Sequence, residues 1–437
     1  MTNVYKILMT LAYPIIFLYL KKRQKKGKES LNPKRFNERF GRASVERPDG
    51  KIVWFHGASL GELNSAMSFM RDTIKRYPNV KILITYASHN ADKVIPAKFK
   101  DNPNFICQYI PVDIPFCVER FINYWRPSVG FFIDSELWPA LLSSVKKHGI
   151  PMFLLNTRIT EQAFKKFSNF FGKKLFNEMI NTFDFIFTTS RVDERYLKQL
   201  IPSENHNKVK NFESLKYSAA PLIPNATKLK ELQDMIGTRL RWVAGSTHKT
   251  DNAEEHAVFA AHAEIIKQYP NALLIICPRQ YTRMPEICDI AKKYNLTFAV
   301  RSKGEKITDE TNIYIADTLG EMGIFYSITD VVFIGRSLVN LGGSNPIEPM
   351  QLKSVTITGK YYQNFKDMVD EMLEKQVIVG LKSPKQLGEI VKRCFDKNNA
   401  EDLKDIIDRS YDFVMSKANV KEKIFDTIKN ICNTKLG

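Results

Sequence analysis

Short apolar segments alternate with amphipathic helical stretches along most of the chain. The first half contains the apolar segments KIVWF, KILITYAS, FICQYIPV, VGFFID, MFLLN and FDFIFTTS, mostly separated by helix-length sequences. The second half contains RWVAGST, ALLIICP, NIYIAD, VVFIG and SVTITG, and NAEEHAVFAAHAEIIKQY is a clear amphipathic helix. Strands that alternate with helices are typical of parallel sheets. The pattern therefore predicts an α/β protein with two Rossmann-like domains that face each other across a cleft.

Length and polar stretches predict where the domains begin and end. A chain of 437 residues is too long for one ordinary core, so two domains are expected. The polar, proline-bearing stretch from Ser203 to Lys228 is a plausible crossover between them. We predict an N-terminal anchor with a basic linker over residues 1–28, one domain over 29–215 and a second over 216–437. The closing segment reads as helix, and the last helix is a candidate to pack back on the N-terminal domain.

The N-terminal segment departs from the α/β pattern. ILMTLAYPIIFLYL, from Ile7 to Leu20, is an apolar run of 14 residues, and six of the next eight residues, KKRQKKGK, are basic. As a helix this run would be about 21 Å long, shorter than the ~30 Å hydrocarbon core of a bilayer. A cleaved signal peptide is disfavoured, because the charges follow the apolar run. We expect an anchor held by anionic lipids of the inner membrane, with the bulk of the protein in the cytoplasm; the alternative is a buried first helix.

Net charge and cysteine spacing narrow the range of partners. The formal net charge of +18 indicates an anionic partner, which is a nucleic acid, a membrane surface or a phosphorylated substrate. The six cysteines are scattered without metal-ligand spacing, so we expect small core residues in a reducing compartment. The chain contains no GxxxxGK[ST], HExxH or DxD motif and no GxGxxG after a strand. A nucleotide is therefore expected to bind without the phosphate loop of ATPases and without an obligatory metal.

One carboxylate lies in the first strand-to-helix turn. KIVWFHGASLGELNSAMSFM, residues 51–70, reads as a strand, a glycine-bearing turn and a helix, with Glu62 in the turn. Such junctions bind ligands in α/β proteins, and the N–H groups of the new helix suit an anion. Glu62 is also explained as an acidic residue that favours the positive end of the helix dipole. The turn makes Glu62 a candidate and leaves its role open.

Three segments of the second half are candidates for nucleotide binding. AGSTHKTDNAEE places Ser246 and Thr247 where hydroxyl and N–H donors approach a phosphate, although an ordinary helix cap explains them equally. CPRQ places Arg279 at a strand end, as a bidentate phosphate ligand or as a surface charge. In GGSNPIEP, prolines fix φ and glycines permit close approach around Glu348. A carboxylate there can accept both hydroxyls of a ribose, unless the loop is simply pinned by its prolines.

Eight motifs together resemble one family. They are WFHGASLGE, DSELWPALL, FLLNTRIT, SLKYS, VAGSTHKTDNAEE, CPR, DTLGEMGIFYSITDVVFIGRSL and GGSNPIEP, in this order from about residue 50 to residue 365. The sequence resembles the 3-deoxy-D-manno-octulosonic acid (Kdo) transferases of lipid A assembly, which have the GT-B fold. The resemblance implies an inverting glycosyltransferase that moves Kdo from CMP-Kdo to a lipid IVA-like acceptor in lipopolysaccharide biosynthesis. It implies the cytoplasmic face of the inner membrane, no dissociable cofactor and no nucleic-acid partner.

The resemblance also implies roles for individual residues. Glu62 corresponds to the general base, Glu136 to a residue that assists the transition state, and Lys216 to a cationic residue. The segments that hold CMP correspond to Pro278, Arg279, Gly320, Glu321, Met322, Asn345, Pro346, Ile347 and Glu348, with Ser246 and Thr247 as further candidates. The N-terminal domain would then serve the acceptor and the C-terminal domain the donor.

Three positions depart from the family pattern, and two other functions are alternatives to the one that the resemblance implies. Ser344 stands where the family usually has His, Arg336 where it has a second Gly, and Asp134 where many members have Glu. One competing function is another GT-B transferase, or a sugar-nucleotide epimerase, that uses a UDP-sugar. The other is a basic, membrane-tethered nucleic-acid-binding protein. That function needs aromatic and basic residues interleaved on a binding platform, and no such motif appears.

Overall fold

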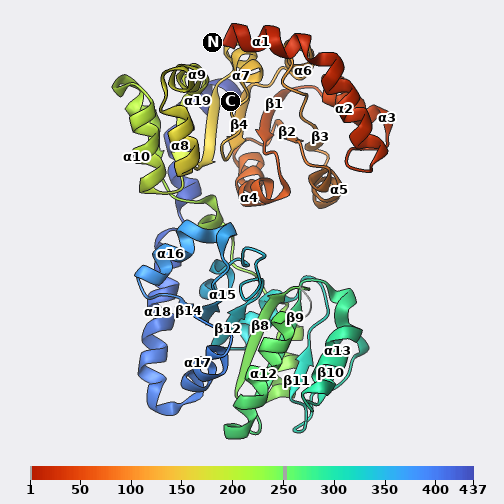
Figure 1. The fold of residues 1–437 in the computed structure, drawn as a ribbon, viewed down its shortest axis with the longest axis vertical. Helices are drawn as coiled ribbons and strands as arrows, with labels where there is room; N and C mark the ends of the chain where they lie inside the picture. The colour runs from red at the N-terminus through yellow and green to blue at the C-terminus, as the bar shows by residue number, and fades with distance from the viewer. Residues whose placement is uncertain (1, 250–252) are drawn as a thin grey trace. The chain divides into compact units, whose positions relative to one another are not determined.

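The computed structural model describes residues 2–249 and 253–437, and Figure 1 shows the course of the chain. It divides into two compact units: Met1–Ala219 with Ala418–Gly437 form unit 1, and Ala220–Lys417 form unit 2. Each unit is built on a parallel sheet of seven strands. The predicted α/β class with two parallel sheets is therefore confirmed. Met1 of the predicted anchor and Thr250–Asn252 of the AGSTHKTDNAEE motif lie outside the described residues.

The sheet of unit 1 has the strand order β3-β2-β1-β4-β5-β6-β7. Its strands are β1 (Lys51–His56), β2 (Val80–Tyr86), β3 (Phe105–Tyr109), β4 (Val129–Ile133), β5 (Met152–Thr157), β6 (Phe185–Thr188) and β7 (Val209–Asn211). The order of the strands reverses between β1 and β4. Ligands of open α/β sheets bind at the carboxyl ends of the strands beside such a switch point.

Helices cover both faces of this sheet, because its strands are apolar on both sides. Val53 and Phe55 of β1 face the layer that contains α4, α5 and α19, whereas Ile52 and Trp54 face α6, α7, α9 and α10. The helices of unit 1 are α1 (Thr2–Leu11), α2 (Tyr13–Lys25), α3 (Pro33–Asn37), α4 (Leu60–Arg76), α5 (His89–Lys98), α6 (Pro115–Trp125), α7 (Pro139–Lys147), α8 (Glu161–Phe167), α9 (Phe170–Ile180), α10 (Arg191–Leu200) and α19 (Val420–Leu436). Two buried layers thus hold the carboxyl ends of β1, β4 and β5 in fixed positions.

Unit 2 repeats this plan with the strand order β10-β11-β9-β8-β12-β13-β14. Its strands are β8 (Arg241–Thr247), β9 (Leu273–Pro278), β10 (Phe298–Val300), β11 (Ile313–Ile315), β12 (Val331–Ile334), β13 (Val355–Thr358) and β14 (Val379–Gly380). Its helices are α11 (Ala226–Ile236), α12 (Ala253–Gln268), α13 (Met284–Lys293), α14 (Met322–Ser327), α15 (Ile347–Gln351), α16 (Lys366–Glu374), α17 (Gln386–Phe395) and α18 (Ala400–Ser416). The core against α12, α13 and α17 covers one face, and the core against α11 and α14 covers the other. The switch point of this sheet lies between β8 and β12.

The elements that the sequence pattern missed are short or broken. The unpredicted strands β7, β10 and β14 have 3, 3 and 2 residues and lie at sheet edges. A strand of that length carries no readable alternation. The closing segment Asp402–Lys435, predicted as helix, is interrupted after Ser416 and forms parts of α18 and α19. These two helices belong to different units, and α19 packs on α4 through the stacked rings of Phe69 and Phe425, whose centroids are 4.2 Å apart.

The N-terminal apolar run forms two helices instead of one. α1 and α2 are bent by 61° at their junction, and a proline lies in the first turn of α2. Among the described residues no single helix is long and apolar enough to cross a membrane; only the bent pair meets those criteria, by length and composition. One side of the pair packs on the rest of unit 1, where Tyr13 and Phe17 contact Phe40. A single membrane-anchor helix is therefore not confirmed.

Candidate functional site

Polar side chains gather at the carboxyl ends of the central strands of unit 1. His56 is the last residue of β1, Asp134 and Glu136 follow β4, and Asn156 lies in β5. Glu62 lies in the first turn of α4, the helix that follows β1. Because β1 and β4 flank the switch point, these residues occupy the position where this sheet type binds ligands.

Glu62 takes part in the N-terminal cap of α4. The Oγ of Ser59 accepts a hydrogen bond from the Glu62 N–H over 3.3 Å and donates one to Glu62 Oε1 over 2.6 Å. The Ala58 N–H donates to Glu62 Oε2 over 2.7 Å. Each carboxylate oxygen keeps lone-pair capacity for a substrate hydroxyl. The structural role at the helix end and a role as a base are therefore compatible in the same side chain.

The pKa values of Glu62 and Glu136 are shifted in opposite directions. Burial raises the pKa of Glu62, and the nearby carboxylates of Glu136 and Asp134 raise it further, against the hydrogen bond from Ser59. Burial also acts on Glu136, but the hydrogen bond and charge of His56 outweigh it, so the net pKa of Glu136 is lowered. Paired carboxylates with pKa values shifted in opposite directions are typical of acid–base sites.

His56 and a tryptophan fix the position of Glu136. His56 Nε2 lies 3.3 Å from Glu136 Oε2, and its Nδ1 lies 3.0 Å from Thr85 Oγ1 and 3.2 Å from the Thr85 carbonyl oxygen. Trp138 Nε1 donates to the same Glu136 oxygen over 2.6 Å. His56 has no exposed surface. One carboxylate oxygen of Glu136 is thus held by two ring nitrogens, and no hydrogen bond to the other oxygen, Oε1, is seen in the described structure.

Lys216 supplies a cation to the same site. It lies in the 3-10 turn Leu215–Ser218 (η3), within unit 1. Burial lowers the pKa of Lys216 to about 8, and the charge of Arg158 adds to this effect, whereas Asp134 opposes it. Asp134 interacts electrostatically with Glu62, Glu136 and Lys216, so the three side chains assigned to catalysis from sequence lie in one neighbourhood.

Asn156 connects the elements that carry these groups. Its Nδ2 donates to Ser65 Oγ on α4 over 2.9 Å, and its Oδ1 accepts from the Leu215 N–H over 2.8 Å. The backbone of Asn156 has a φ of 52°, a left-handed conformation that asparagine tolerates better than most residues. Asn156 therefore holds η3, and with it Lys216, against the helix of Glu62. Sequence reasoning missed Asn156 and His56, although both lie in quoted motifs.

In unit 2, four residues lie around the hydroxyl of one buried tyrosine. Tyr326 of α14 is hydrogen-bonded to Ser246 and lies near the charges of Glu348 and Arg279. Burial and the charge of Glu348 raise the pKa of Tyr326 well above its usual value, against the hydrogen bond from Ser246 and the charge of Arg279. A Cβ on Gly245 would lie 2.4 Å from the Tyr326 hydroxyl, so only glycine fits there. Ser246, Arg279 and Glu348, which come from three separate motifs, thus meet at this place. Sequence reasoning missed Tyr326, because its motif gives no sign of the contact.

The strand ends next to this cluster carry further predicted residues. Pro278 ends β9, and the Arg279 N–H donates to the Thr247 carbonyl oxygen over 2.8 Å. Thr247 is fully buried, and its Oγ1 has no hydrogen-bond partner within the described residues. The backbones of Thr247 and Arg279 thus meet at this strand end, where the Arg279 side chain is exposed.

The proline-bearing segment positions Glu348 in the first turn of α15. Asn345 Nδ2 donates to Glu348 Oε1 over 3.1 Å, and the Asn345 Oδ1 accepts from the Ile347 N–H over 3.2 Å. Pro346 precedes the helix as its N-cap residue. Burial raises the pKa of Glu348, against the hydrogen bond from Asn345 and the charge of Arg279. The segment holds a half-buried carboxylate with its second oxygen available to a ligand.

The third predicted segment uses its carboxylate within the protein. Gly320 has a φ of 79°, Glu321 follows it, and Met322 begins α14. Glu321 binds Arg301 through two hydrogen bonds of 2.6 and 3.1 Å and Lys228 through one of 2.8 Å. The hydrogen bond from Arg301 is the main cause that lowers the pKa of Glu321 to about 2. A nucleotide would therefore meet the backbone of this segment and not a free carboxylate.

A second buried glutamate organises the switch point of unit 2. Glu254 accepts hydrogen bonds from four backbone N–H groups, those of His248, Arg336, Ser337 and Leu338, at 2.9 to 3.3 Å. It thereby ties the loop after β8 to the loop after β12. Arg336, where the family pattern has a glycine, has the left-handed φ of 63° that glycine favours.

No cluster of at least three His, Cys, Asp or Glu side chains suited to a metal ion occurs in residues 2–249 and 253–437.

The solved structures that this chain resembles show its fold. A glycosyltransferase from Rickettsia africae has a TM-score of 0.57 at 12% identity, covering 88% of this chain and 99% of that chain. The UDP-GlcNAc 2-epimerase from Neisseria meningitidis, solved with UDP-GlcNAc, has a TM-score of 0.55 at 11% identity, covering 87% and 100%. At such identity the likeness concerns the fold alone. It shows the GT-B fold, with two α/β units.

Sequence comparison gives the family. Residues 34–219 match the family model described as 3-deoxy-D-manno-octulosonic-acid transferase (kdotransferase). A probable mitochondrial 3-deoxy-D-manno-octulosonic acid transferase from Arabidopsis thaliana is 30% identical over 378 residues, covering 84% of this chain and 82% of the relative. The transferase from Haemophilus influenzae is 27% identical over 97% of both chains. The chain belongs to the Kdo transferase family. The predicted family, the glycosyltransferase class and Kdo transfer are confirmed, which decides against a transferase or epimerase that uses a UDP-sugar.

Proposed function

We propose that this protein transfers Kdo from CMP-Kdo to a lipid IVA-type lipid A precursor during lipopolysaccharide biosynthesis, with inversion at the anomeric carbon. The family membership supports the Kdo group. The observation that carries the assignment of residues is the pair of glutamates with pKa values shifted in opposite directions at the switch point of unit 1. In this proposal unit 1 activates the acceptor, and unit 2 binds the nucleotide of the donor.

Glu62 acts as the general base. The acceptor hydroxyl loses its proton to a free lone pair of the Glu62 carboxylate while its oxygen attacks the anomeric carbon of Kdo. The bond from that carbon to the phosphate oxygen of CMP breaks with its electron pair, so CMP leaves as an anion. A single displacement needs only one base. The raised pKa of Glu62 makes its carboxylate a stronger base than an ordinary one.

Glu136 and Lys216 stabilise the charges that develop. The sugar acquires positive charge as the leaving group departs, and Glu136 stays ionised beside it because of the contacts from His56 and Trp138. Lys216 is a half-buried cation suited to the negative charge of the leaving phosphate. Fixed charges of this kind stabilise a transition state because they need no reorganisation during the reaction.

The donor nucleotide is assigned to the cluster around Tyr326. Arg279 suits a phosphate, and Glu348 can accept both hydroxyls of the ribose. The remaining predicted positions are Ser246, Thr247, Pro278, Gly320, Glu321, Met322, Asn345, Pro346 and Ile347, and they would contribute N–H groups, hydroxyls and the shape of the site. Ser344 and Arg336 depart from the family pattern, so they would make the lining of this nucleotide site differ from that of most family members. The reaction as proposed needs no dissociable cofactor and no nucleic acid.

The acceptor is a lipid, so the enzyme has to work at a membrane. The bent pair α1 and α2, with the basic segment KKRQKKGK, would lie on the cytoplasmic face of the inner membrane and bind its anionic lipids. A net charge of +18 favours such a surface and a phosphorylated acceptor. Deletion of residues 2–28 should release the folded protein from membranes and preserve turnover of detergent-dispersed acceptor.

Product analysis tests the proposal. The protein is incubated with CMP-Kdo and lipid IVA, and released CMP and the mass of the lipid are measured. The proposal predicts a lipid heavier by a whole number of Kdo residues and one CMP for each residue added. UDP-sugars should give no product. Release of CMP without any Kdo on the lipid would assign another acceptor and refute the proposal.

A further inference from the structure

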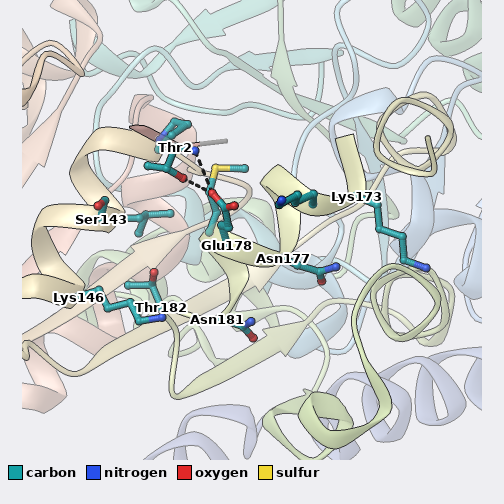
Figure 2. A pocket seen from close by; sticks show the side chains of 12 residues that line it. Thr2, Ser143, Lys146, Lys173, Asn177, Glu178, Asn181 and Thr182 are labelled. Atoms are coloured by element: carbon teal, nitrogen blue, oxygen red, sulfur yellow. Dashed lines mark hydrogen bonds between the residues drawn. The ribbon is translucent and has the colours of Figure 1, made fainter. Parts of the chain in front are cut away.

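A cavity of about 650 Å³ lies on the outer side of the helices of unit 1, between α1, α7 and α9. Figure 2 shows its side chains from close by, with Glu178 at the centre, Lys146 on one side and Lys173 on the other. None of the residues that line it belongs to the set assigned to catalysis or to CMP. The function proposed above leaves this cavity unexplained.

The cavity has a surplus of positive charge. Lys146, Lys173 and Lys174 line it, and none of them forms an ion pair with a carboxylate in the described part of the chain. Its one carboxylate, Glu178, accepts hydrogen bonds of 2.9 and 2.6 Å from the N–H and Oγ1 of Thr2. These bonds lower the pKa of Glu178, so its charge is directed to the start of α1. Three ammonium groups remain to attract an anion.

The cavity also contains an unsatisfied acceptor. The Oδ1 of Asn177 is buried and has no hydrogen-bond partner among residues 2–249 and 253–437. A buried amide oxygen without a donor is unfavourable. A ligand with a hydroxyl group would satisfy it. The cavity therefore suits a molecule that combines an anionic group with a hydroxyl donor.

The helix that closes the cavity has an apolar outer face. Val4, Ile7, Leu8 and Leu11 of α1 have exposed fractions of 60% to 71%, whereas Thr2 of the same helix lines the cavity. Single exposed apolar residues are ordinary, but successive turns of one helix with this exposure mark an interaction surface. The exposed side chains continue on α2, where Ile15, Leu18 and Tyr19 are more than half exposed. An apolar face beside a cationic cavity matches a lipid that has an anionic headgroup and apolar acyl chains.

We propose that this cavity binds the headgroup of an anionic glycerophospholipid from the membrane on which α1 and α2 lie. The phosphate contacts Lys146, Lys173 and Lys174, a headgroup hydroxyl donates to Asn177, and the acyl chains run along the apolar face of α1. This proposal rests on the membrane association that belongs to the proposed function. It adds the class of lipid that is bound and the cavity that binds it. Binding of the headgroup also makes this surface selective for anionic lipids, which a purely apolar contact would not be.

Vesicle flotation tests the site with the full-length protein. Binding to phosphatidylcholine vesicles with and without 30% phosphatidylglycerol, a roughly bacterial proportion, is compared at fixed ionic strength. The variant K146Q/K173Q/K174Q should need on the order of 100-fold more phosphatidylglycerol vesicles for half binding, at about 5-fold per charge. The matched control K306Q/K382Q/K385Q removes three exposed lysines of unit 2 and should bind within about 3-fold of the parent.

A second variant separates a cavity from a diffuse basic surface. Thr182→Phe places a ring in the cavity without changing any charge. If the headgroup enters the cavity, this variant loses most of the preference for phosphatidylglycerol over phosphatidylcholine, and its thermal unfolding stays cooperative. Addition of inorganic phosphate at constant ionic strength should leave the parent bound, because a free phosphate lacks the acyl chains.

The results distinguish failure of the site from failure of the proposed function. If the lysine triple variant or Thr182→Phe keeps the full preference for phosphatidylglycerol, the site is refuted, while Kdo transfer and membrane association stand. If the triple variant binds vesicles normally but has a raised KM for detergent-dispersed lipid IVA, the lysines bind the acceptor, and the site is again refuted. If the parent binds neither vesicle type, membrane association itself is wrong, and the site fails with it.

Discussion

The pKa of Lys216 predicts how the rate falls at alkaline pH. Burial lowers this pKa to about 8, so Lys216 is about nine-tenths protonated at pH 7 and about one-tenth at pH 9. If the ammonium is needed for departure of CMP, kcat/KM falls about 10-fold between these pH values. At acid pH the rate rises as Glu62 loses its proton, at a pKa above that of an ordinary carboxyl. The profile is therefore a bell whose alkaline side belongs to Lys216.

Lys216→Arg isolates the contribution of the charge. Arginine stays protonated throughout this range, so the variant should lose the alkaline fall and keep activity at pH 7 within about 10-fold of the parent. Lys208→Arg, in the same unit, is the matched exchange and should keep the fall. The measurement is initial rates of CMP release at subsaturating CMP-Kdo from pH 6 to pH 10. This condition reports the free enzyme, because a bound anionic donor raises the pKa of the lysine.

Two results would refute this reasoning. A parent profile that stays flat between pH 7 and pH 9 would show that protonated Lys216 is not required. An unchanged alkaline fall in Lys216→Arg would assign the fall to another group.

Three further changes test the surroundings of the site. His56→Gln should raise the pKa of Glu136, so the pH–rate profile loses activity first at its acid end, and an unchanged acid side would show that His56 does not control Glu136. Asn156→Ala leaves the buried N–H of Leu215 without its acceptor, so unfolding should become easier by about 1–3 kcal/mol and kcat should fall; equal stability would show that the segment is held otherwise. Glu348→Ala should weaken CMP binding in calorimetry by about 1–3 kcal/mol, and unchanged affinity would place the ribose elsewhere.

Much of the fold follows from patterns that are local in sequence. The buried strands β1, β2, β4 and β5 are continuous apolar runs, and the helices between them have a regular apolar face, so a parallel α/β arrangement is predictable. Edge strands such as β10 and β14 depend on pairing with a neighbour and carry no pattern of their own. The break between α18 and α19 is equally hidden, because polar residues on both sides of it are compatible with one helix.

In the candidate site, too, local contacts are predictable from sequence and distant ones are not. Glu62 is noticeable from sequence because its turn is a recognisable junction, and capping partners lie within four residues of it. His56, Asn156 and Tyr326 act through contacts with residues far along the chain, such as the 80 positions between His56 and Glu136. Only the sheet topology brings these partners together. Sequence spacing alone cannot reveal them, although the family motifs contained all three.

The central claim is that Glu62 removes the acceptor proton, and its rival is that Glu62 only caps α4. The change Glu62→Gln keeps the size of the side chain and an oxygen that can accept from Ala58, so little stability should be lost. Ser59→Ala does the opposite: it removes the cap, at about 0.5–2 kcal/mol, and leaves the base in place. The two variants therefore separate capping from catalysis.

The decisive measurement is single-turnover transfer of Kdo from CMP-Kdo to lipid IVA by the parent, Glu62→Gln and Ser59→Ala, with folding and CMP affinity checked for each. We predict that Glu62→Gln binds CMP normally and loses about 10²- to 10⁴-fold in rate, while Ser59→Ala stays within about 10-fold of the parent. A well-folded Glu62→Gln protein that transfers Kdo within about 3-fold of the parent rate would contradict the account and leave Glu62 as a helix cap.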